Sequence, residues 1–348
     1  MASKDEKGGV QTWQGSLRDT PRVLEDMSSA VRKAGSAALA LQRTELSRTE
    51  KAGHHDIVTE GDLVSQRIAM GSLAKILPGL PFAAEESDEQ AMIPGVPQAR
   101  INPQGLVEAE AYLALDPVDG TTNFACGGPD WGVAAAVVQR DTGPTHGVLY
   151  LPGKDLVVEA ARGHGCRVNG ELIQLRKDQV LRECLVAAEI GKFVPDDRLQ
   201  RLLGLVHHSM GVRNLFSSTG NTADVLSGVH GAWVHLKGGS VWDFAAGSLA
   251  VEEVTLSSAG VERSSRAPFA VCFYSQHQFC FGTVGHGTAP SCLADSVLRG
   301  ILCAFCSKRM LTFSSAVPSI WRPAFLCGCV LSLCCGRNRS MSPFCAGN

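Results

Sequence analysis

Long apolar runs are missing from this sequence of 348 residues. The nearest candidate, Phe325–Cys335, is shorter than the roughly 18 to 20 apolar residues that a helix needs to span a bilayer, and it is rich in cysteine. The N-terminal residues 1–14 mix charged side chains with glycine and contain no apolar stretch, so they do not resemble a secretory signal. We therefore expect a cytoplasmic protein without a membrane segment.

A basic excess is absent as well. The chain carries 32 lysines and arginines against 34 aspartates and glutamates, a formal net charge of -2. Surfaces that bind nucleic acid usually show a surplus of positive charge, so a nucleic acid polymer is excluded as the expected partner. The length leaves room for a large layered domain with a deep site, and a small soluble substrate fits these properties better.

Cysteine is scarce in the first part of the chain and acidic residues are scarce in the last. Only Cys126, Cys166 and Cys184 of the 13 cysteines precede residue 260, and Asp295 is the only acidic residue after Glu262. The two parts do not read like one protein, and a frameshift, a retained intron or an alternative exon is our hypothesis for the difference. We expect a disordered N-terminus at 1–20, a main domain at 21–255 whose second sheet is incomplete, and a disordered, Cys-rich atypical tail at 256–348.

Two amphipathic helices are indicated near the N-terminus. Thr20 is a good N-cap residue, Pro21 suits the first helical position, and apolar residues then recur at helical spacing as far as Leu41. A second pattern of this kind runs over 63–77, has Asp62 in its first turn and stops at a Pro-Gly pair. We expect both segments to pack one face against a sheet.

Strands and helices follow in alternation. Short apolar runs at 81–84 and 112–115 each lead directly to carboxylates, which is how strands deliver acidic side chains to a sheet edge. Asn169–Gly170 has the composition of a hairpin turn. The pattern predicts an α+β fold with an antiparallel sheet and two layered sheets. The further expected strands are 132–138, 147–151, 156–161, 184–190 and 232–236, and the later helices are 195–208 and 243–254.

The most informative stretch is LALDPVDGTTNF at 113–124, where an apolar strand leads to two carboxylates three residues apart. Pro117 fixes its own φ, so the backbone turns rigidly and Asp116 and Asp119 can face one point. The carbonyl of Val118 is a further hard oxygen ligand, and Mg2+ prefers such oxygens. This pattern predicts a magnesium site.

The residues that follow suit an anion. Gly120 has no Cβ where a phosphate must approach the backbone. Thr121 and Thr122 open a helical turn whose free N–H groups can bind negative charge. The motif therefore offers places for both a metal and a phosphate group.

Further acidic positions could complete a centre with more than one metal ion. Glu85 follows the strand at 81–84, and Asp243 follows Trp242 at the start of a late helix. Taken singly, each has a simpler interpretation, because a carboxylate pair after a strand is often a solvated turn and an acid at a helix N-terminus is favoured by the dipole. Their occurrence together in one chain favours the metal centre.

Four blocks of this sequence resemble the inositol monophosphatase family, part of the lithium-sensitive, magnesium-dependent phosphatase superfamily that includes fructose bisphosphatases. They occur in the family's order and span about residues 22–254. The resemblance implies a layered α/β/α/β/α sandwich of the inositol monophosphatase and fructose bisphosphatase type, a homodimer, and hydrolysis of a small phosphate monoester by a metal-activated water. The blocks are DIVTEGD at 56–62, EES at 85–87, LDPVDGTTNF at 115–124 and WDFAAG at 242–247.

The resemblance also implies roles for single residues. One magnesium would be bound by Glu85, Asp116 and the Val118 carbonyl, and a second by Asp116, Asp119 and Asp243. The water would be activated by Glu85 and Thr121, with Asp62 orienting Thr121. The substrate would contact Gly120, Thr121, Thr122, Asp119 and Asp243.

Some positions depart from the family pattern and leave the substrate open. Inositol-specific members carry a glutamate where this chain has His235–Leu236, Thr222 replaces a small apolar residue, and Ala84 replaces a glycine. Adenosine 3',5'-bisphosphate and histidinol phosphate therefore stand as alternatives to an inositol monophosphate.

Other readings belong to other classes. The chain could be an inactive relative that serves as a binding or scaffold protein, although its complete acidic set argues against this, or an isoform that its tail prevents from folding. The pairs His54–His55 and His207–His208 point their side chains apart and are expected at the surface. The cysteines of the tail lack the regular spacing of a zinc site.

Overall fold

The computed structural model describes residues 17, 19–44, 48–53, 56–103, 105–174, 181–190, 206–235, 239–259 and 271–273. All of them lie in the first of two compact units, Met1–Phe305; the second unit is Cys306–Asn348. The tail beyond residue 273 lies outside the described residues, so its predicted character is neither supported nor contradicted. Among the described residues, no helix is both long and apolar enough to cross a membrane.

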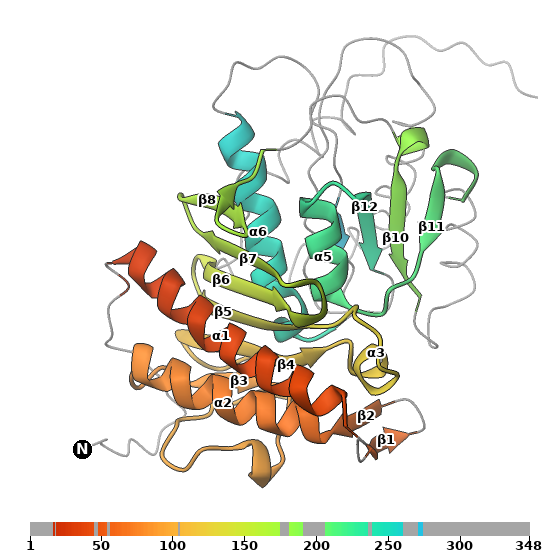
Figure 1. Cartoon of the computed structure of the whole chain (residues 1–348). Coiled ribbons are helices and arrows are strands. Elements are labelled where there is room, and N and C mark those ends of the chain that lie inside the picture. The colour runs from red at the N-terminus through yellow and green to blue at the C-terminus, as the bar shows by residue number, and fades with distance from the viewer. Residues whose placement is uncertain are drawn as a thin grey trace, which may run out of the picture. The chain divides into compact units, whose positions relative to one another are not determined.

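The larger sheet has seven strands in the order β3-β4-β5-β6-β7-β8-β9 (Figure 1). All neighbours in it pair antiparallel except β3 and β4, which are parallel. The antiparallel sheet expected from the alternating apolar runs is thus present. Its strands are β3 (Phe82–Ala84), β4 (Ala111–Asp119), β5 (Gly132–Gln139), β6 (Gly143–Leu151), β7 (Leu156–Ala161), β8 (Gly165–Val168) and β9 (Glu171–Leu172).

Helices α1 (Thr20–Gln42) and α2 (Glu60–Ile76) cover one face of this sheet (Figure 1). Their apolar residues recur at helical spacing and meet every second residue of the central strands, because side chains alternate between the faces of a strand. One prediction was wrong in detail, since the N-cap of α1 is Asp19, whose carboxylate accepts from the Arg22 N–H, and Thr20 is already helical. This core contains Met27, Val31, Met70, Leu73, Leu113, Leu115, Val133 and Val137.

Helices α5 (Ser218–Leu226) and α6 (Val241–Ala259) cover the opposite face. Side chains of β4 that do not face α1 and α2 point towards α5 and α6. This strand is therefore buried on both sides. α6 was expected over 243–254 and is longer, whereas α5 was not predicted as a helix. The second core contains Tyr112, Ala114, Ala134, Ala136, Ala223, Leu226, Ala245 and Leu249.

A second sheet is entirely parallel, in the order β11-β10-β12-β13. It packs against α5 and α6 through a small cluster that includes Trp233 and Phe244. The expected layers of helices, sheet, helices and sheet are therefore present, while most of the helix predicted at 195–208 lies outside the described residues. The strands are β10 (Leu185–Glu189), β11 (Gly211–Arg213), β12 (His230–His235) and β13 (Val271–Phe273).

The described chain also contains a hairpin and a short helix. A hairpin of β1 (Arg48–Gly53) and β2 (Asp56–Thr59) precedes α2, and α3 (Thr121–Ala125) follows β4. The predicted turn at Asn169–Gly170 joins β8 to β9, and both of its residues have positive φ, at 49° and 82°, as a two-residue hairpin turn of type I′ requires. The short helix α3 matters most here, because it begins at the residues expected to hold phosphate.

Candidate functional site

The carboxylates of the central motif lie inside a strand and not in a turn after it. β4 continues through Asp116 to Asp119, where the expected strand ended at residue 115. Pro117 sits at a shift of register against β5, between Asp116 and Asp119, and this irregularity lets a proline occupy a central strand. The Val118 N–H donates to Asp116 Oδ1 at 3.1 Å. Asp116 and Asp119 are 2% and 8% exposed, so the strand carries both acids into the protein interior.

Glu85 reaches Asp116 from the neighbouring strand. It follows β3 directly, and its backbone N–H donates to the Leu115 carbonyl at 3.1 Å, which extends the parallel pairing of β3 with β4. Its side chain hydrogen-bonds to that of Asp116. Two strand ends that are far apart in sequence thus bring their carboxylates into contact.

One face of α2 supports both of these strand ends. Ser65 Oγ donates to the Pro117 carbonyl at 2.7 Å, across the register shift. Gln66 makes two hydrogen bonds to the backbone of Glu86. Gln66 Nε2 donates to the Glu86 carbonyl at 2.6 Å, and Gln66 Oε1 accepts from the Glu86 N–H at 3.0 Å. Both side chains are fully buried. Neither residue could be predicted from local sequence, because their partners are 52 positions away for Ser65 and 20 for Gln66.

Asp62 contacts Thr121, as the resemblance implied. It is fully buried in the first turn of α2, where Oδ2 accepts from the N–H and the hydroxyl of Thr59 in a capping box. Its other oxygen, Oδ1, lies 3.2 Å from Thr121 Oγ1, which also lies 3.0 Å from the Val118 carbonyl. A hydroxyl has one proton, so Thr121 donates to one of these oxygens at a time and keeps lone pairs for another donor.

Gly120 is required by the backbone at the start of α3. Its φ is 90°, a left-handed conformation that favours glycine, and an added Cβ would lie 3.0 Å from the Asp130 carbonyl oxygen. The first hydrogen bond of α3 runs from the Phe124 N–H to the Gly120 carbonyl, so the N–H groups of Thr121 and Thr122 precede the helical ladder. Thr122 is exposed.

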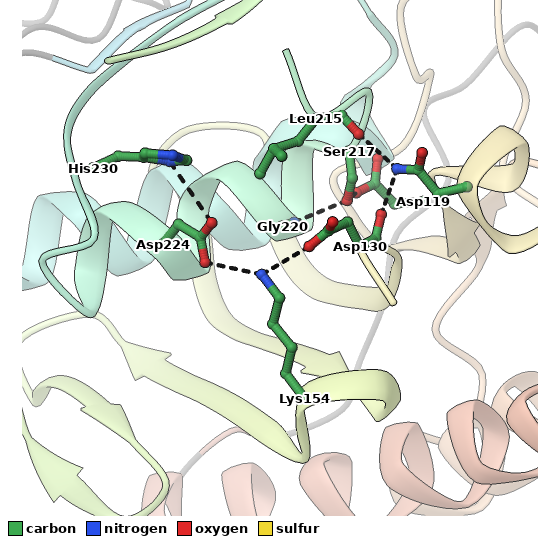
Figure 2. A network of polar contacts seen from close by, with 9 residues as sticks. Asp119, Asp130, Lys154, Leu215, Ser217, Gly220, Asp224 and His230 are labelled. Carbon is green, nitrogen blue, oxygen red and sulfur yellow. Dashed lines mark hydrogen bonds and ion pairs between the residues drawn. The ribbon is translucent and has the colours of Figure 1, made fainter. Parts of the chain in front are cut away.

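Asp119 is bound by the first turn of α5. Its Oδ2 accepts from Ser217 Oγ and from the Thr219 N–H, both at 2.6 Å, and its Oδ1 accepts from the Ser218 N–H at 3.1 Å. Ser217 Oγ in turn accepts from the Gly220 N–H at 2.9 Å (Figure 2). Burial raises the pKa of Asp119, and these hydrogen bonds oppose that shift.

Asp243 is the remaining acid of the set. It lies in the first turn of α6, and its Oδ2 accepts from the Ser240 N–H at 2.7 Å. Asp243 therefore does have the expected role of an acid at the N-terminus of a helix, but it has a second interaction as well. Asp243 is also close enough to Asp116 for its charge to raise the pKa of that carboxyl.

The four carboxylates form one strongly acidic cluster. Burial raises the pKa of Asp116 well above its usual range, and the charges of Glu85, Asp119 and Asp243 raise it further. Such a cluster is costly unless a proton or a cation neutralises it. Within the described ranges, no group of three or more His, Cys, Asp and Glu side chains is arranged as a formed metal site. The acids instead bind one another and the starts of α5 and α6.

His235 is the residue for which the resemblance to inositol-specific family members led us to expect a glutamate. His235 ends β12, is 2% exposed and stacks on Trp233 with 5.8 Å between ring centroids. Its Nε2 lies 3.8 Å from Glu189 Oε1, on the neighbouring strand β10. A buried carboxylate is therefore still present at this edge of the second sheet.

Comparisons with known proteins bear on the family and the fold of this chain. The model of the inositol monophosphatase family matches residues 20–261. The inositol-1-monophosphatase of Synechocystis sp. is 29% identical over 70% of this chain and 77% of its own, and the Nus factor SuhB of Pseudomonas aeruginosa is 28% identical over 64% and 80%. The solved structure of an IMPase from Thermotoga maritima superimposes with a TM-score of 0.55 at 25% identity, over 69% of this chain and 84% of that one.

Proposed function

Because the chain belongs to the inositol monophosphatase family and is a phosphoric monoester hydrolase on that ground, we propose that it hydrolyses a small phosphate monoester of the inositol monophosphate type with the help of magnesium. The observation that carries this proposal is the acidic cluster of Glu85, Asp116, Asp119 and Asp243, in which each of the other three charges raises the pKa of Asp116. A cluster with this much unbalanced negative charge suits divalent cations.

The donor set fits magnesium. Carboxylates and the Val118 carbonyl are hard oxygen ligands, and the described chain adds no thiolate or imidazole to the cluster that would favour a softer metal. We assign one magnesium to Glu85, Asp116 and the Val118 carbonyl, and a second to Asp116, Asp119 and Asp243. Bound magnesium would lower the pKa of a water molecule and neutralise charge that builds up on the phosphoryl oxygens.

The residues of the chain then have distinct tasks. Glu85 and the Thr121 hydroxyl would accept hydrogen bonds from the attacking water, and Asp62 would hold Thr121 in place through the contact at 3.2 Å. The N–H groups at Gly120, Thr121 and Thr122 would bind the phosphate, because they lie before the first hydrogen bond of α3. Asp119 and Asp243 would contact the rest of the substrate.

The substrate branch is left to experiment. His235 in place of a glutamate, and Thr222 within α5, keep adenosine 3',5'-bisphosphate and histidinol phosphate as alternatives. A binding role without catalysis is the rival from another class, and a relative named as a Nus factor is compatible with it. The complete acidic set favours hydrolysis. A homodimer, inhibition by lithium and a cytoplasmic location remain proposals.

The deciding experiment measures phosphate release by the purified full chain with and without magnesium. The substrates are inositol 1-phosphate, adenosine 3',5'-bisphosphate, fructose 1,6-bisphosphate and histidinol phosphate, and Asp119→Asn is the inactive comparison. Release that needs magnesium, is inhibited by lithium and is lost in Asp119→Asn supports the proposal and identifies the branch. A cooperatively folded protein that releases no phosphate from any of them would favour the binding role.

A further inference from the structure

Lys154 links two carboxylates that lie outside the acidic cluster. It ends the 3-10 turn Pro152–Lys154 after β6, and its Nζ lies 2.9 Å from Asp130 Oδ1 and 3.0 Å from Asp224 Oδ1 (Figure 2). The exposed fractions of the three side chains are 28%, 32% and 12% for Lys154, Asp130 and Asp224, so the ion pairs are largely shielded from solvent. Ion pairs in such positions are screened much less than surface pairs.

The two carboxylates come from the two segments that meet at Asp119. Asp130 belongs to the stretch that follows α3, and its backbone carbonyl accepts from Asn123 Nδ2 at 2.6 Å. The same Nδ2 also lies 2.6 Å from the Leu215 carbonyl, just before α5. Asn123 and Lys154 therefore tie the motif segment to α5 at two places, one at each end of this short helix.

Helix α5 is held by contacts at both of its ends. Its first turn donates to Asp119 from Ser217, Ser218 and Thr219, while Asp224 lies in its second half. α5 has only nine residues, so a shift at Asp224 moves its first turn as well. The three donors to Asp119 and the residue bound by Lys154 thus belong to the same short, stiff element.

The charges around Lys154 explain why a cationic side chain is needed there. Burial alone would lower the pKa of Lys154, but its hydrogen bonds to Asp130 and Asp224 raise it above the usual value, so the side chain stays cationic. His230 is fully buried 3.8 Å from Asp224, and burial lowers its pKa, so at neutral pH it does not replace the lysine charge. Removing Lys154 would leave two shielded carboxylates without a cation.

We propose that Lys154 is a positioning residue, which holds α5 against the segment after α3 and thereby keeps the first turn of α5 on Asp119. This inference rests on the proposed function, in which Asp119 is a magnesium ligand. According to this inference, Lys154 affects magnesium affinity although it lies 35 positions beyond Asp119 in the sequence and outside the acidic cluster.

The first test needs neither metal nor substrate. Hydrogen exchange of the Ser218 and Thr219 amides would be compared in wild type, Lys154→Met and Lys154→Arg, all without magnesium. We expect exchange to be faster by roughly tenfold in Lys154→Met, because loss of a charge-assisted contact loosens the helix, and close to wild type in Lys154→Arg. Amides of β5 report global opening of the protein. Asp155→Asn is the matched control, because Asp155 follows Lys154 in the sequence and forms an exposed ion pair with Arg32.

The second test measures binding of magnesium alone by titration calorimetry. We expect weaker binding by roughly tenfold in Lys154→Met and no change in Asp155→Asn. If Lys154→Met does not fold, Asp224→Asn removes one arm of the network and keeps the other. Equal exchange at Ser218 and Thr219, or equal magnesium affinity with only a lower overall stability, would overturn the inference.

The two proposals fail in different ways. A wild-type chain that neither binds magnesium nor releases phosphate would refute the proposed function, and with it the magnesium half of the inference, while the exchange experiment would still decide whether Lys154 fixes α5. A wild type that binds and hydrolyses normally, with Lys154→Met unchanged in both measurements, would refute the inference alone.

Discussion

Gln66 binds the backbone of Glu86 with both ends of its side-chain amide, donating to the carbonyl at 2.6 Å and accepting from the N–H at 3.0 Å. The amide thus pairs with the backbone of Glu86 as a neighbouring strand would, and Glu86 directly follows Glu85. The position of the first carboxylate of the cluster therefore depends on a neutral side chain of α2.

Replacing Gln66 by leucine tests this relationship. The change removes both hydrogen bonds between the Gln66 amide and the buried backbone of Glu86, so we expect the free energy of unfolding to fall by about 2 to 3 kcal/mol and phosphatase activity to fall with it. Thermal or urea unfolding measures the first effect. Gln98→Leu is the control, since Gln98 makes an exposed contact to Val96, and we expect a change within about 0.5 kcal/mol. Equal losses in the two variants would contradict the role of Gln66.

Asp116→Asn should stabilise the protein in the absence of metal. Asparagine keeps an oxygen for the Val118 N–H and cannot ionise, at a position where burial and three neighbouring acids oppose a negative charge, so we expect a higher unfolding midpoint in EDTA. Wild type should gain about 2.7 kcal/mol from magnesium at one hundred times its Kd, and the variant should gain much less. Differential scanning calorimetry with and without magnesium decides. Asp141→Asn, at an exposed acid, should keep the full magnesium increment.

The Thr121 hydroxyl is expected to be needed for the reaction itself. Thr121→Val removes the group that contacts Asp62 and the Val118 carbonyl, and we expect kcat/KM to fall by about 100-fold, in the range typical of acid-base assistance. Thr121→Ser keeps the hydroxyl and should retain most of the activity. Steady-state kinetics with a substrate that the phosphate-release experiment identifies would show this difference, and similar losses in both variants would assign Thr121 a packing role only.

His146 should make stability depend on pH. It is buried in β6, and burial, with a smaller effect of the His164 charge, lowers its pKa from 6.5 to about 4. The unfolded state therefore binds the proton first, so this contribution to stability is complete above pH 6.5 and is lost as the pH falls towards 4. Between pH 7.5 and pH 5 we expect wild type to lose about 2 kcal/mol more stability than His146→Gln, which lacks this contribution. Urea unfolding at both pH values measures it.

Phe216 is strained just before the first turn of α5. Its φ is 51°, a left-handed conformation that is unfavourable for a bulky residue, and its side chain is 48% exposed. Both Phe216→Gly and Phe216→Ala remove the ring, but only glycine relieves the backbone. We expect the glycine variant to be more stable than the alanine variant by about 1 kcal/mol. Met210 is the control, because it is 65% exposed and has no positive φ. There we expect Met210→Ala to be more stable than Met210→Gly.

The sequence predicted those parts of the site whose partners are close along the chain. The strand, proline and carboxylates of β4 could be read directly, and so could the helical start containing Asp62. The length of β4 could not, because the register shift that accommodates Pro117 depends on its neighbour β5. The N-cap of α1 was placed one residue late, since both Asp19 and Thr20 are good capping residues.

Helix α5 was missed for a physical reason. Its sequence, STGNTADVL, is rich in residues of low helix propensity and has no clear apolar stripe. It is helical because Ser217 caps it, Asp119 accepts its first N–H groups and all nine residues are buried. Lys154 was overlooked in the same way, because its partner Asp224 is 70 positions away. The effect of a partner so distant in sequence cannot be read from local pattern.

The bond between Asp119 and α5 also bears on how the protein is made. The carboxylate and its two backbone donors are 99 and 100 positions apart, so a ribosome that has just finished β4 must add about a hundred residues before the acid meets its partners. Until then, two acids of β4 that will be buried must stay hydrated, and the end of the strand cannot close over them. The first half of the chain therefore lacks the partners that bury Asp119, and a chain truncated before Ser217 would never acquire the three donors to this carboxylate.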